Sequence, residues 1–558
     1  MNKRTAVLSL VSLASLLVPN VFADNPIIQT CYTADPAPMV YNGTVYLYID
    51  HDSDNAPSSS YLLSNWKCYS STDMVNWTDH GVILAPGQFS WATTKDADAT
   101  QCVYRNGKFY YYISTTASGG VSIGVAVSNS PLGPFKDTLG KPLIATSLMT
   151  GCNATHSWRG LDPTVFIDDD GQAYLYWGNQ VSYWVKLNTD MISYSGSINC
   201  LPDNDTAAFG PNYQEGPWFY KRNAHYYLVY PSSFSEAIRY TMSTVPTGSW
   251  TYKGQIQPVQ TGTGSSSTNQ AGICDFGGNS YFFYHNGALS GGGSYKRSVC
   301  LEKFTYNADS TIPAIPPTTG GVTAGVGHLN PYDTTPAVTI CWESGVKTEP
   351  CSEGGVDADS IHNGAYIKVK SVDFGSSASS FAARVASGSS GGNIELHLDS
   401  LNGTLGGTCT VKSTGGWQTW VTTTCPVTGI TGIHDLYLKF TGTGTGLLFS
   451  FEWWQFEPAT RIRTTPAEQS ESGNAIRIES DAGKITGIHL DFALPSAGKL
   501  NIALFDLKGR NLATLFAGQL SSQKHLAVPV NAEIGPGAYL VKATLNGRSL
   551  INNMVLIK

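Results

Sequence analysis

The chain has 558 residues, of which only 13% are charged, and its formal net charge is −7. Such a length exceeds one ordinary core, so we expect two to four domains. The scarcity of charge and the lack of a basic run argue against nucleic acid and favour a neutral polymer as partner. The abundant Gly, Ser, Thr and Tyr indicate all-β domains, because aromatic and β-branched residues favour strands.

Residues 1–23 have the pattern of a secretory signal. Lys3 and Arg4 precede an apolar run over residues 6–18, and Val21-Phe22-Ala23 supplies a cleavage site. The run is short for a membrane span, and no later segment is long and apolar enough to cross a bilayer. A buried first strand is the alternative. We therefore expect a secreted or cell-surface protein without a membrane span.

All eleven cysteines follow the signal. An oxidising compartment favours their pairing. We predict the pairs Cys341–Cys351 and Cys409–Cys425, and the seven cysteines before residue 301 leave one odd thiol. No Cys or His spacing indicates zinc.

A turn followed by an alternating aromatic strand recurs between residues 26 and 310. Asn-Gly and Asp-Gly turns between such strands are strong hairpin signals. A second Ser/Asn-rich motif follows most copies, so each period holds about four strands, and four-stranded units repeated roughly every 50 to 65 residues predict a β-propeller. Five copies predict five blades, and they lie at residues 42–48, 106–112, 170–176, 222–228 and 277–283.

Three carboxylates precede these turns at nearly one offset. Asp35 lies eight residues before the glycine of its turn, and Asp162 and Glu215 lie nine residues before the corresponding positions. In a propeller these are the starts of the strands nearest the axis, so symmetry would gather them at one end of the channel. The same offset gives Asp98 and Asn269 in the other copies. A slip of one residue would turn a side chain away.

Gathered carboxylates cost energy unless their pKa values separate, so proteins keep them mainly for metal binding or acid–base work. Two carboxyl groups that flank a glycosidic bond are what sugar hydrolysis requires. Alone, each Asp-Pro pair is more readily interpreted as a turn. Three carboxylates at one repeat offset favour a catalytic site.

Residues 26 to about 320 resemble glycoside hydrolase family 43. The resemblance rests on Ala-Asp-Pro-Ala-Pro at 34–38, Asp-Pro-Thr-Val-Phe at 162–166 and Gln-Glu-Gly-Pro at 214–217. It implies a five-bladed propeller and hydrolysis with inversion. It also implies that Asp35 is the general base, that Glu215 is the general acid, and that Asp162 orients the acid and tunes its pKa.

The resemblance suggests further site residues, each with a structural alternative. His285 matches an axial histidine near a bound calcium or water, which makes it a candidate for binding a structural Ca²⁺ in the propeller, or is a structural histidine after an aromatic strand, while the chemistry requires no cofactor. Arg297 is a candidate for binding sugar hydroxyls, or is a surface arginine. His51, Trp91 and Trp218 are candidates for stacking or rim contacts, or pack within a blade.

After a Pro/Thr/Gly-rich linker, residues 331–457 alternate in the manner of a β-sandwich. They resemble carbohydrate-binding module family 6. The matching stretches are residues 372–375, 391–396, 413–420 and 434–437. The resemblance implies that Trp417 stacks on sugar, with Tyr366 as its partner.

This module departs from its family in two places. The acidic ligands of a structural calcium are replaced around Pro336 and Val338, and Ser450 stands where a sugar-contacting Asn is expected. These departures argue against calcium in the module and predict weak or lost sugar binding.

A second linker, near residues 458–474, precedes further strands in residues 475–558. Gly509-Arg510 and Pro536-Gly537-Ala538-Tyr539 resemble the C-terminal sorting domain of type IX secretion substrates. A fibronectin-like spacer is the alternative.

These features together predict an all-β protein. Its expected parts are a signal over 1–23, a hydrolase propeller over 24–320, a binding sandwich over 331–457 and a sorting domain over 475–558. We expect a monomeric exported enzyme that acts on plant cell-wall polysaccharide and removes α-L-arabinofuranosyl groups from arabinoxylan. The alternatives are a β-xylosidase or xylanase acting on the xylan chain, and a non-catalytic polysaccharide-binding protein.

Overall fold

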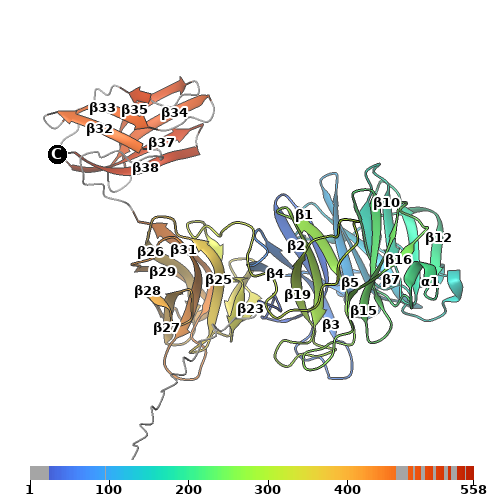
Figure 1. Cartoon of the computed structure of the whole chain (residues 1–558). Helices are drawn as coiled ribbons and strands as arrows, with labels where there is room; N and C mark the ends of the chain where they lie inside the picture. Colours follow the sequence, from blue (N-terminus) through green and yellow to red (C-terminus); the bar gives the residue numbers. More distant parts are fainter. Residues whose placement is uncertain are drawn as a thin grey trace, which may run out of the picture. The chain divides into compact units, whose positions relative to one another are not determined.

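The computed structural model describes most of the chain outside the signal. The described residues are 24–94, 96–459, 475–481, 484–491, 497–506, 510–520, 526–528, 537–546 and 548–557. The predicted signal lies outside them. The chain divides into two compact units, Met1–Glu457 and Pro458–Lys558, which are described separately (Figure 1).

Residues 32–304 form five antiparallel sheets that follow one another along the chain (Figure 1). The first two sheets contain β1 (Tyr32–Tyr41), β2 (Thr44–Asp52), β3 (Leu63–Ser71) and β4 (Trp77–Leu84), then β5 (Asp98–Arg105), β6 (Lys108–Ala117), β7 (Gly120–Ser128) and β8 (Lys136–Asp137). The next two contain β9 (Thr164–Ile167), β10 (Ala173–Trp177), β11 (Val181–Leu187) and β12 (Tyr194–Pro202), then β13 (Trp218–Arg222), β14 (His225–Ser232), β15 (Ala237–Ser243) and β16 (Thr251–Gln257). The last contains β17 (Gly272–Phe276), β18 (Asn279–Asn286) and β19 (Ser298–Phe304).

The first strands of these sheets meet one another around an axis. β1 contacts β5, β5 contacts β9, β9 contacts β13, and β17 contacts β1. Between β13 and β17, the Trp218 indole donates to the Ile273 carbonyl at 3.1 Å. The first strands therefore form a closed ring, which is the propeller arrangement. One short α-helix, α1 (Thr206–Phe209), lies in the connection between β12 and β13.

The aromatic strands that the repeats predicted are the second strands of the sheets. Their alternate side chains supply much of the core between blades, as the pleat of a strand requires. The buried rings include Tyr48, Tyr111, Tyr176, Tyr227 and Phe282. The predicted Asn-Gly turns also form, because Asn42 and Asn106 adopt the left-handed conformation with φ of 48° and 50°.

Two facing sheets form the predicted sandwich after residue 334. One contains β20 (Thr335–Pro336), β23 (Lys347–Pro350), β24 (Val356–Asp359), β26 (Ala378–Ser387), β29 (Gly416–Pro426) and β31 (Ser450–Pro458). The other contains β22 (Trp342–Ser344), β25 (Tyr366–Asp373), β27 (Gly391–Leu398), β28 (Thr404–Lys412) and β30 (Ile433–Thr441). Their inner faces share one apolar core that includes Phe381, Phe440 and Trp454.

The strand β21 (Thr339–Ile340) joins this sandwich to the propeller. It pairs with β4 and so becomes the fifth strand of the first propeller sheet. The next residues return to the sandwich, where the Cys341 N–H bonds to the Lys368 carbonyl at 2.9 Å. The two domains are therefore joined by a shared sheet as well as by the linker.

The second unit also consists of antiparallel strands where it is described. One sheet contains β32 (Ala475–Asp481), β33 (Lys484–Asp491) and β36 (Leu526–Val528), and another contains β34 (Gly498–Phe505), β35 (Asn511–Leu520), β37 (Gly537–Leu545) and β38 (Arg548–Ile557). The predicted small β domain is thus present. Its sorting role stays a prediction, and Gly509 and Pro536 of the motif lie outside the described residues.

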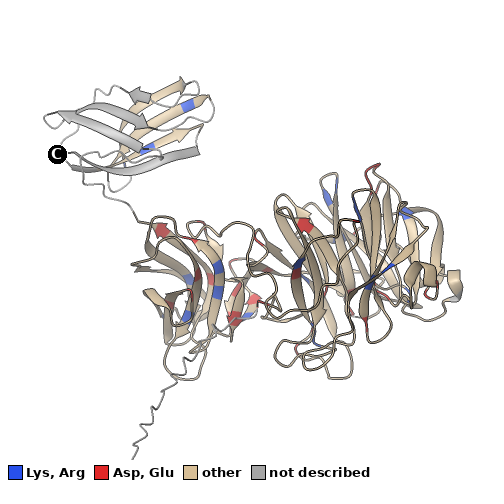
Figure 2. Ribbon diagram, in the orientation of Figure 1, with Lys and Arg blue, Asp and Glu red and all other residues tan. Residues whose placement is uncertain are grey.

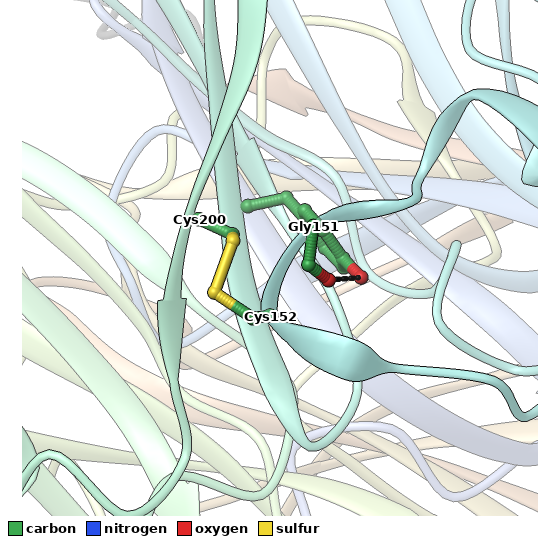
Figure 3. The surroundings of a disulfide bond; sticks show 4 residues. Gly151, Cys152 and Cys200 are labelled. Atoms are coloured by element: carbon green, nitrogen blue, oxygen red, sulfur yellow. Dashed lines mark hydrogen bonds between the residues drawn. A yellow bond between two sulfur atoms is a disulfide. The ribbon is translucent and has the colours of Figure 1, made fainter.

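One disulfide is present among the described cysteines, between Cys152 and Cys200 (Figure 3). It ties a 3-10 turn, Gly151–Asn153, to β12. The Tyr183 hydroxyl donates to the Gly151 carbonyl in the same turn at 3.3 Å. The long connection that leads to β9 is therefore fastened to the third sheet.

The two predicted disulfides were wrong for this structure. Cys341 faces Asp24, with 3.7 Å between sulfur and carboxylate oxygen, whereas Cys351 packs elsewhere, beside Trp420. Cys409 on β28 and Cys425 on β29 face each other from the two sheets of the sandwich but remain free thiols. The spacing of cysteines along the chain does not show whether two of them form a disulfide, lie close together as free thiols, or lie far apart.

Charged side chains are sparse on the first unit, and both signs are interspersed over its strands (Figure 2). In the part of the chain that the structure describes, no helix combines the length and apolar character needed to cross a bilayer.

Candidate active site

The structure brings the three repeat carboxylates together at the starts of inner strands. Asp35 lies in β1, Asp162 lies two residues before β9, and Glu215 lies three residues before β13. Asp162 Oδ2 accepts the N–H of Gly216 at 2.9 Å, which links it to the residue after Glu215. The charges of Asp35 and Glu215 both raise the pKa of Asp162. The site is therefore assembled from three sheets.

A left-handed backbone recurs at these positions. The φ angles are 49° at Asp35, 63° at Asp162 and 55° at Gly216. Aspartate is one of the few non-glycine residues found in this region, which costs on the order of 1 kcal/mol and is tolerated mainly at functional sites. In β1 the ladder with β2 also breaks between Ala34 and Ala37. Because of these local irregularities, the directions of the carboxylate side chains do not follow the regular alternation of a β-strand.

Asp35 is held in its ionised form. The Arg297 Nη1 atom lies 3.2 Å from Asp35 Oδ2. Burial raises the pKa of Asp35, but the charge of Arg297 and a hydrogen bond from Asp50 outweigh burial and lower the pKa below its ordinary value. A buried carboxylate in this state can accept a proton, which is what a general base requires.

Asp50 lies beneath Asp35 on the neighbouring strand, because the register pairs Ala34 with Asp50. Its side chain is fully buried, and its Oδ2 accepts from Arg297 Nη2 at 3.0 Å. Burial and the charge of Asp35 raise its pKa well above the ordinary value. Asp50 is therefore neutral and donates to Asp35. The repeat offset that predicts Asp35 as a site residue does not predict Asp50.

His285 on β18 completes the surroundings of the base. Its Nδ1 accepts the Asp35 N–H at 3.3 Å, and its Nε2 lies 2.9 Å from the Thr268 carbonyl. Burial and the charge of Arg297 lower its pKa to about 4, so the ring is neutral. Both ring nitrogens are engaged, and the described residues contain no group of three His, Cys, Asp or Glu side chains placed to hold a metal. His285 therefore does not fit the expected calcium site and supports Asp35 instead.

The carboxyl groups on the other side of the site have raised pKa values. Burial raises the pKa of Glu215, although a hydrogen bond from Asn179 opposes the shift. Burial and the neighbouring negative charges raise the pKa of Asp162 well above its ordinary value. The raised pKa suits Glu215 to the role of proton donor, and Asp162 fixes the backbone beside it. Asp98 also faces this site, and burial with the charge of Asp96 raises its pKa to about 8.

The structure gives Arg297 a different surrounding from the one expected. Its guanidinium is buried and bonds to Asp35, Asp50 and Asp52, with distances of 2.9 Å to both oxygens of Asp52. It also lies over the Tyr61 ring, 4.9 Å from the centroid. Its donors are therefore engaged by carboxylates, and its evident effect is to keep Asp35 ionised.

The other candidates for the propeller rim are packing residues. Trp218 is only 5% exposed, and its indole is held by β17. Trp91 stands edge-on to Phe89 at 5.4 Å and donates to Asp137. His51 lies between Asp50 and Asp52 on β2, so alternation turns it away from Arg297. The structure does not bring these three side chains to the carboxylates.

Two exposed aromatic side chains, in the connections that carry Asp162 and Glu236, were not among the candidates predicted from the sequence. Trp158 is 62% exposed in the connection that ends at Asp162, and Phe234 is 71% exposed in the turn between β14 and β15. Both lie outside the alternating strands, so the repeat pattern did not include them. Exposed aromatic rings suit contact with a sugar chain.

The two candidates in the sandwich lie on different sheets. Trp417, on β29, is 38% exposed and lies beside Gly388. Tyr366, on β25, is half-buried against Tyr437, with 6.1 Å between ring centroids. Trp417 therefore has an exposed face for a ligand, whereas Tyr366 packs against its own sheet.

Comparisons with known proteins agree with this architecture. Residues 23–312 match the model of glycosyl hydrolases family 43, and residues 336–458 match carbohydrate binding module (family 6). An arabinoxylan arabinofuranohydrolase of Paenibacillus polymyxa is 34% identical over 535 residues, covering 86% of this chain and 79% of the relative. One of Bacillus subtilis (strain 168) is 35% identical over 497 residues, covering 79% and 94%.

The fold likeness extends over both domains. A crystal structure of a family 43 arabinoxylan arabinofuranohydrolase from Bacillus subtilis, in complex with cellotetraose, superposes with a TM-score of 0.69 at 34% identity. It covers 78% of this chain and 98% of that chain. The predicted propeller and sandwich are thereby confirmed, and the chain belongs to glycosyl hydrolases family 43.

Proposed function

We propose that this glycoside hydrolase removes α-L-arabinofuranosyl groups from arabinoxylan with inversion. The observation that carries the proposal is the opposed shift of two carboxyl groups in one site, where the pKa of Asp35 is lowered beside Arg297 and burial raises the pKa of Glu215. The names of the relatives that match over most of the chain support the choice of arabinoxylan.

The chemistry follows from these two opposed shifts. Asp35 accepts a proton from a water molecule as the water oxygen bonds to the anomeric carbon of the sugar. Glu215 gives its proton to the glycosidic oxygen as the bond between that oxygen and the anomeric carbon breaks. Asp162, which accepts the Gly216 N–H, keeps the acid in place. One displacement of this kind gives a product of inverted configuration.

Polysaccharide contact would extend beyond the carboxylates. Trp158 and Phe234 offer exposed rings in the connections that carry Asp162 and Glu236, and Trp417 offers another in the binding module. Rings of this type cover the apolar face of a sugar. We assign the first two to the main chain of the substrate and the third to binding by the module.

We also propose that the protein is exported. The pattern of residues 1–23 supports this location. The Cys152–Cys200 disulfide supports it as well, because such bonds persist in oxidising compartments.

Product analysis tests the function directly. The mature protein and its Glu215→Ala variant are incubated with arabinoxylan, xylo-oligosaccharides and linear arabinan, and the released sugars are identified. We expect arabinose from arabinoxylan with wild type, none with the variant, and retained polysaccharide binding by both. Release of xylose or xylo-oligosaccharides would move the activity to the main chain, and no product at all would leave a binding protein.

Early time points, followed by NMR, test the stereochemistry. We expect the inverted anomer of arabinose first, before mutarotation. Net retention would exclude a single displacement by water activated at Asp35.

A further inference from the structure

Glu236 is a second buried carboxyl group behind the acid. It ends the turn between β14 and β15 and is 2% exposed. Its own N–H bonds to the Ser267 carbonyl at 3.0 Å, and its Oε2 accepts the Asn269 N–H at 2.6 Å. The Glu215 carboxyl lies within hydrogen-bonding reach of the Glu236 carboxyl, whose buried Oε1 has no other hydrogen-bond partner among the described residues. Glu236 is therefore fixed at one oxygen and turned toward Glu215.

A hydrogen bond between two carboxyl groups requires a proton on one of them. Glu215 already receives an N–H from Asn179, which favours negative charge on Glu215. Glu236 is the more deeply buried of the two, and burial disfavours its charged form. Burial and the charge of Glu215 raise the pKa of Glu236 well above its ordinary value. The proton of the shared bond therefore resides on Glu236 once Glu215 is ionised.

Other titratable groups surround the pair. Those that act on Glu215 or Glu236, or on which these two act, are Asp35, Asp98, Asp162, Arg297, Tyr61 and Tyr213. Most are acidic, and the cation among them is bonded to Asp35, Asp50 and Asp52. If Glu236 were ionised together with Asp35 and Glu215, no further cation among these groups would offset its negative charge. This again favours a neutral Glu236.

We infer that Glu236 is a positioning residue for the acid, whose neutral carboxyl group donates a hydrogen bond to Glu215. The inference rests on the proposed role of Glu215. In the reaction Glu215 transfers its proton to the glycosidic oxygen, and Glu236 keeps its own. As Glu215 becomes a carboxylate, the bond from Glu236 becomes charge-assisted and strengthens. It therefore stabilises the transition state more than the resting enzyme.

The hydrogen-bond pattern of Glu236 offers a matched pair of variants. One oxygen accepts the Asn269 N–H and the other group donates to Glu215, which is also the pattern of a glutamine amide. Glu236→Gln keeps both bonds, whereas Glu236→Leu removes both. We expect the Gln variant to retain the wild-type pH profile of kcat/KM. In the Leu variant we expect the high-pH limb of the kcat/KM profile (the basic limb) to move upward by on the order of one pH unit. The reason is that loss of the hydrogen bond to the Glu215 carboxylate raises the pKa of Glu215.

Leaving groups supply a second readout. An aryl arabinofuranoside with a dinitrophenol leaving group needs little protonation, whereas the alcohol of arabinoxylan needs full protonation. We expect Glu236→Leu to lower kcat on arabinoxylan about ten-fold, which is the rate equivalent of one lost hydrogen bond. We expect kcat on the dinitrophenyl substrate to stay within two-fold of wild type. A merely structural defect would slow both substrates alike.

The outcomes separate the inference from the function. If Glu236 were ionised, Glu236→Gln would remove a negative charge and move the basic limb downward, which would overturn the inference even if the Leu variant failed to fold. Equal losses of the Leu variant on both substrates would also overturn it. Wild type without any arabinose release would instead contradict the proposed function.

Discussion

At the scale of single residues, the acid and the base each rest on a second, deeper carboxyl group. Asp50 lies behind Asp35, and Glu236 lies behind Glu215. The difference between the two pairs is Arg297, whose guanidinium bonds to Asp35. A cation bonded to Asp35, and none bonded to Glu215 among the described residues, shifts the pKa values of two similar groups in opposite directions.

Substitution of Asp50 tests the pair behind the base. Asp50→Asn keeps a donor toward Asp35 and an oxygen for Arg297, so we expect the acidic limb of kcat/KM to stay in place. Asp50→Leu removes the donor, so the pKa of Asp35 rises and the acidic limb moves upward. We also expect the free energy of unfolding to fall by about 1–3 kcal/mol in the Leu variant, because buried Arg297 loses a partner.

The measurement is a pH profile on arabinoxylan, beside denaturant unfolding. Asp54→Asn, at an exposed position in the turn that follows β2, is the matched control and should change neither. A downward move of the acidic limb in Asp50→Asn would mean that Asp50 is ionised in the native enzyme.

The repeat pattern predicts the three carboxylates of the site but not the carboxyl groups buried behind them. Asp35, Asp162 and Glu215 were found because one repeat offset places them alike. The position of Asp50 depends on strand register and that of Glu236 on the path of a turn. Neither feature can be recognised in the sequence repeat. Trp218 and His51 are the opposite case. Both are residue types that can bind sugar, but the pleat of their strands directs their side chains into packing contacts.

At the scale of elements, the shared strand β21 is the least predictable feature. Residues 307–330 were predicted to be a linker, whereas residues beyond them return to pair with β4. The edge of the first sheet is thereby covered, which protects a strand that would otherwise expose unpaired backbone groups. Two residues of pairing are too short to be detected by periodicity.

Asn76 fastens this junction and can be tested. Its amide bonds to both the N–H and the carbonyl of Lys370 on β25, each at 2.8 Å. Asn76→Ala leaves these buried backbone groups without their partner, so we expect the free energy of unfolding to fall by about 1–3 kcal/mol. We also expect faster proteolytic cleavage between residues 305 and 335 as the domains separate more often.

Asn204→Ala, at an exposed position, serves as the control and should change neither stability nor cleavage. Unchanged cleavage in Asn76→Ala, despite lower stability, would mean that the sandwich stays docked without this amide.

At the scale of the whole molecule, the site and the binding module belong to one compact unit that ends at Glu457. All the side chains placed at the carboxylate site come from residues 35–297. Removal of residues 458–558 should therefore leave kcat/KM on arabinoxylan within two-fold of the full chain and leave the melting temperature of the first unit unchanged. Assays of the purified protein, with scanning calorimetry, measure both.

Truncation after residue 330 is the contrasting experiment. It removes β21 from β4 and deprives Asn76 and Asp79 of their partners Lys370 and Thr348. A newly exposed sheet edge favours aggregation, so we expect poor recovery of soluble protein and loss of activity. If this shorter chain were as active and stable as the one ending at residue 457, the sandwich would be an independent binding module, and the shared strand would contribute nothing to the catalytic domain.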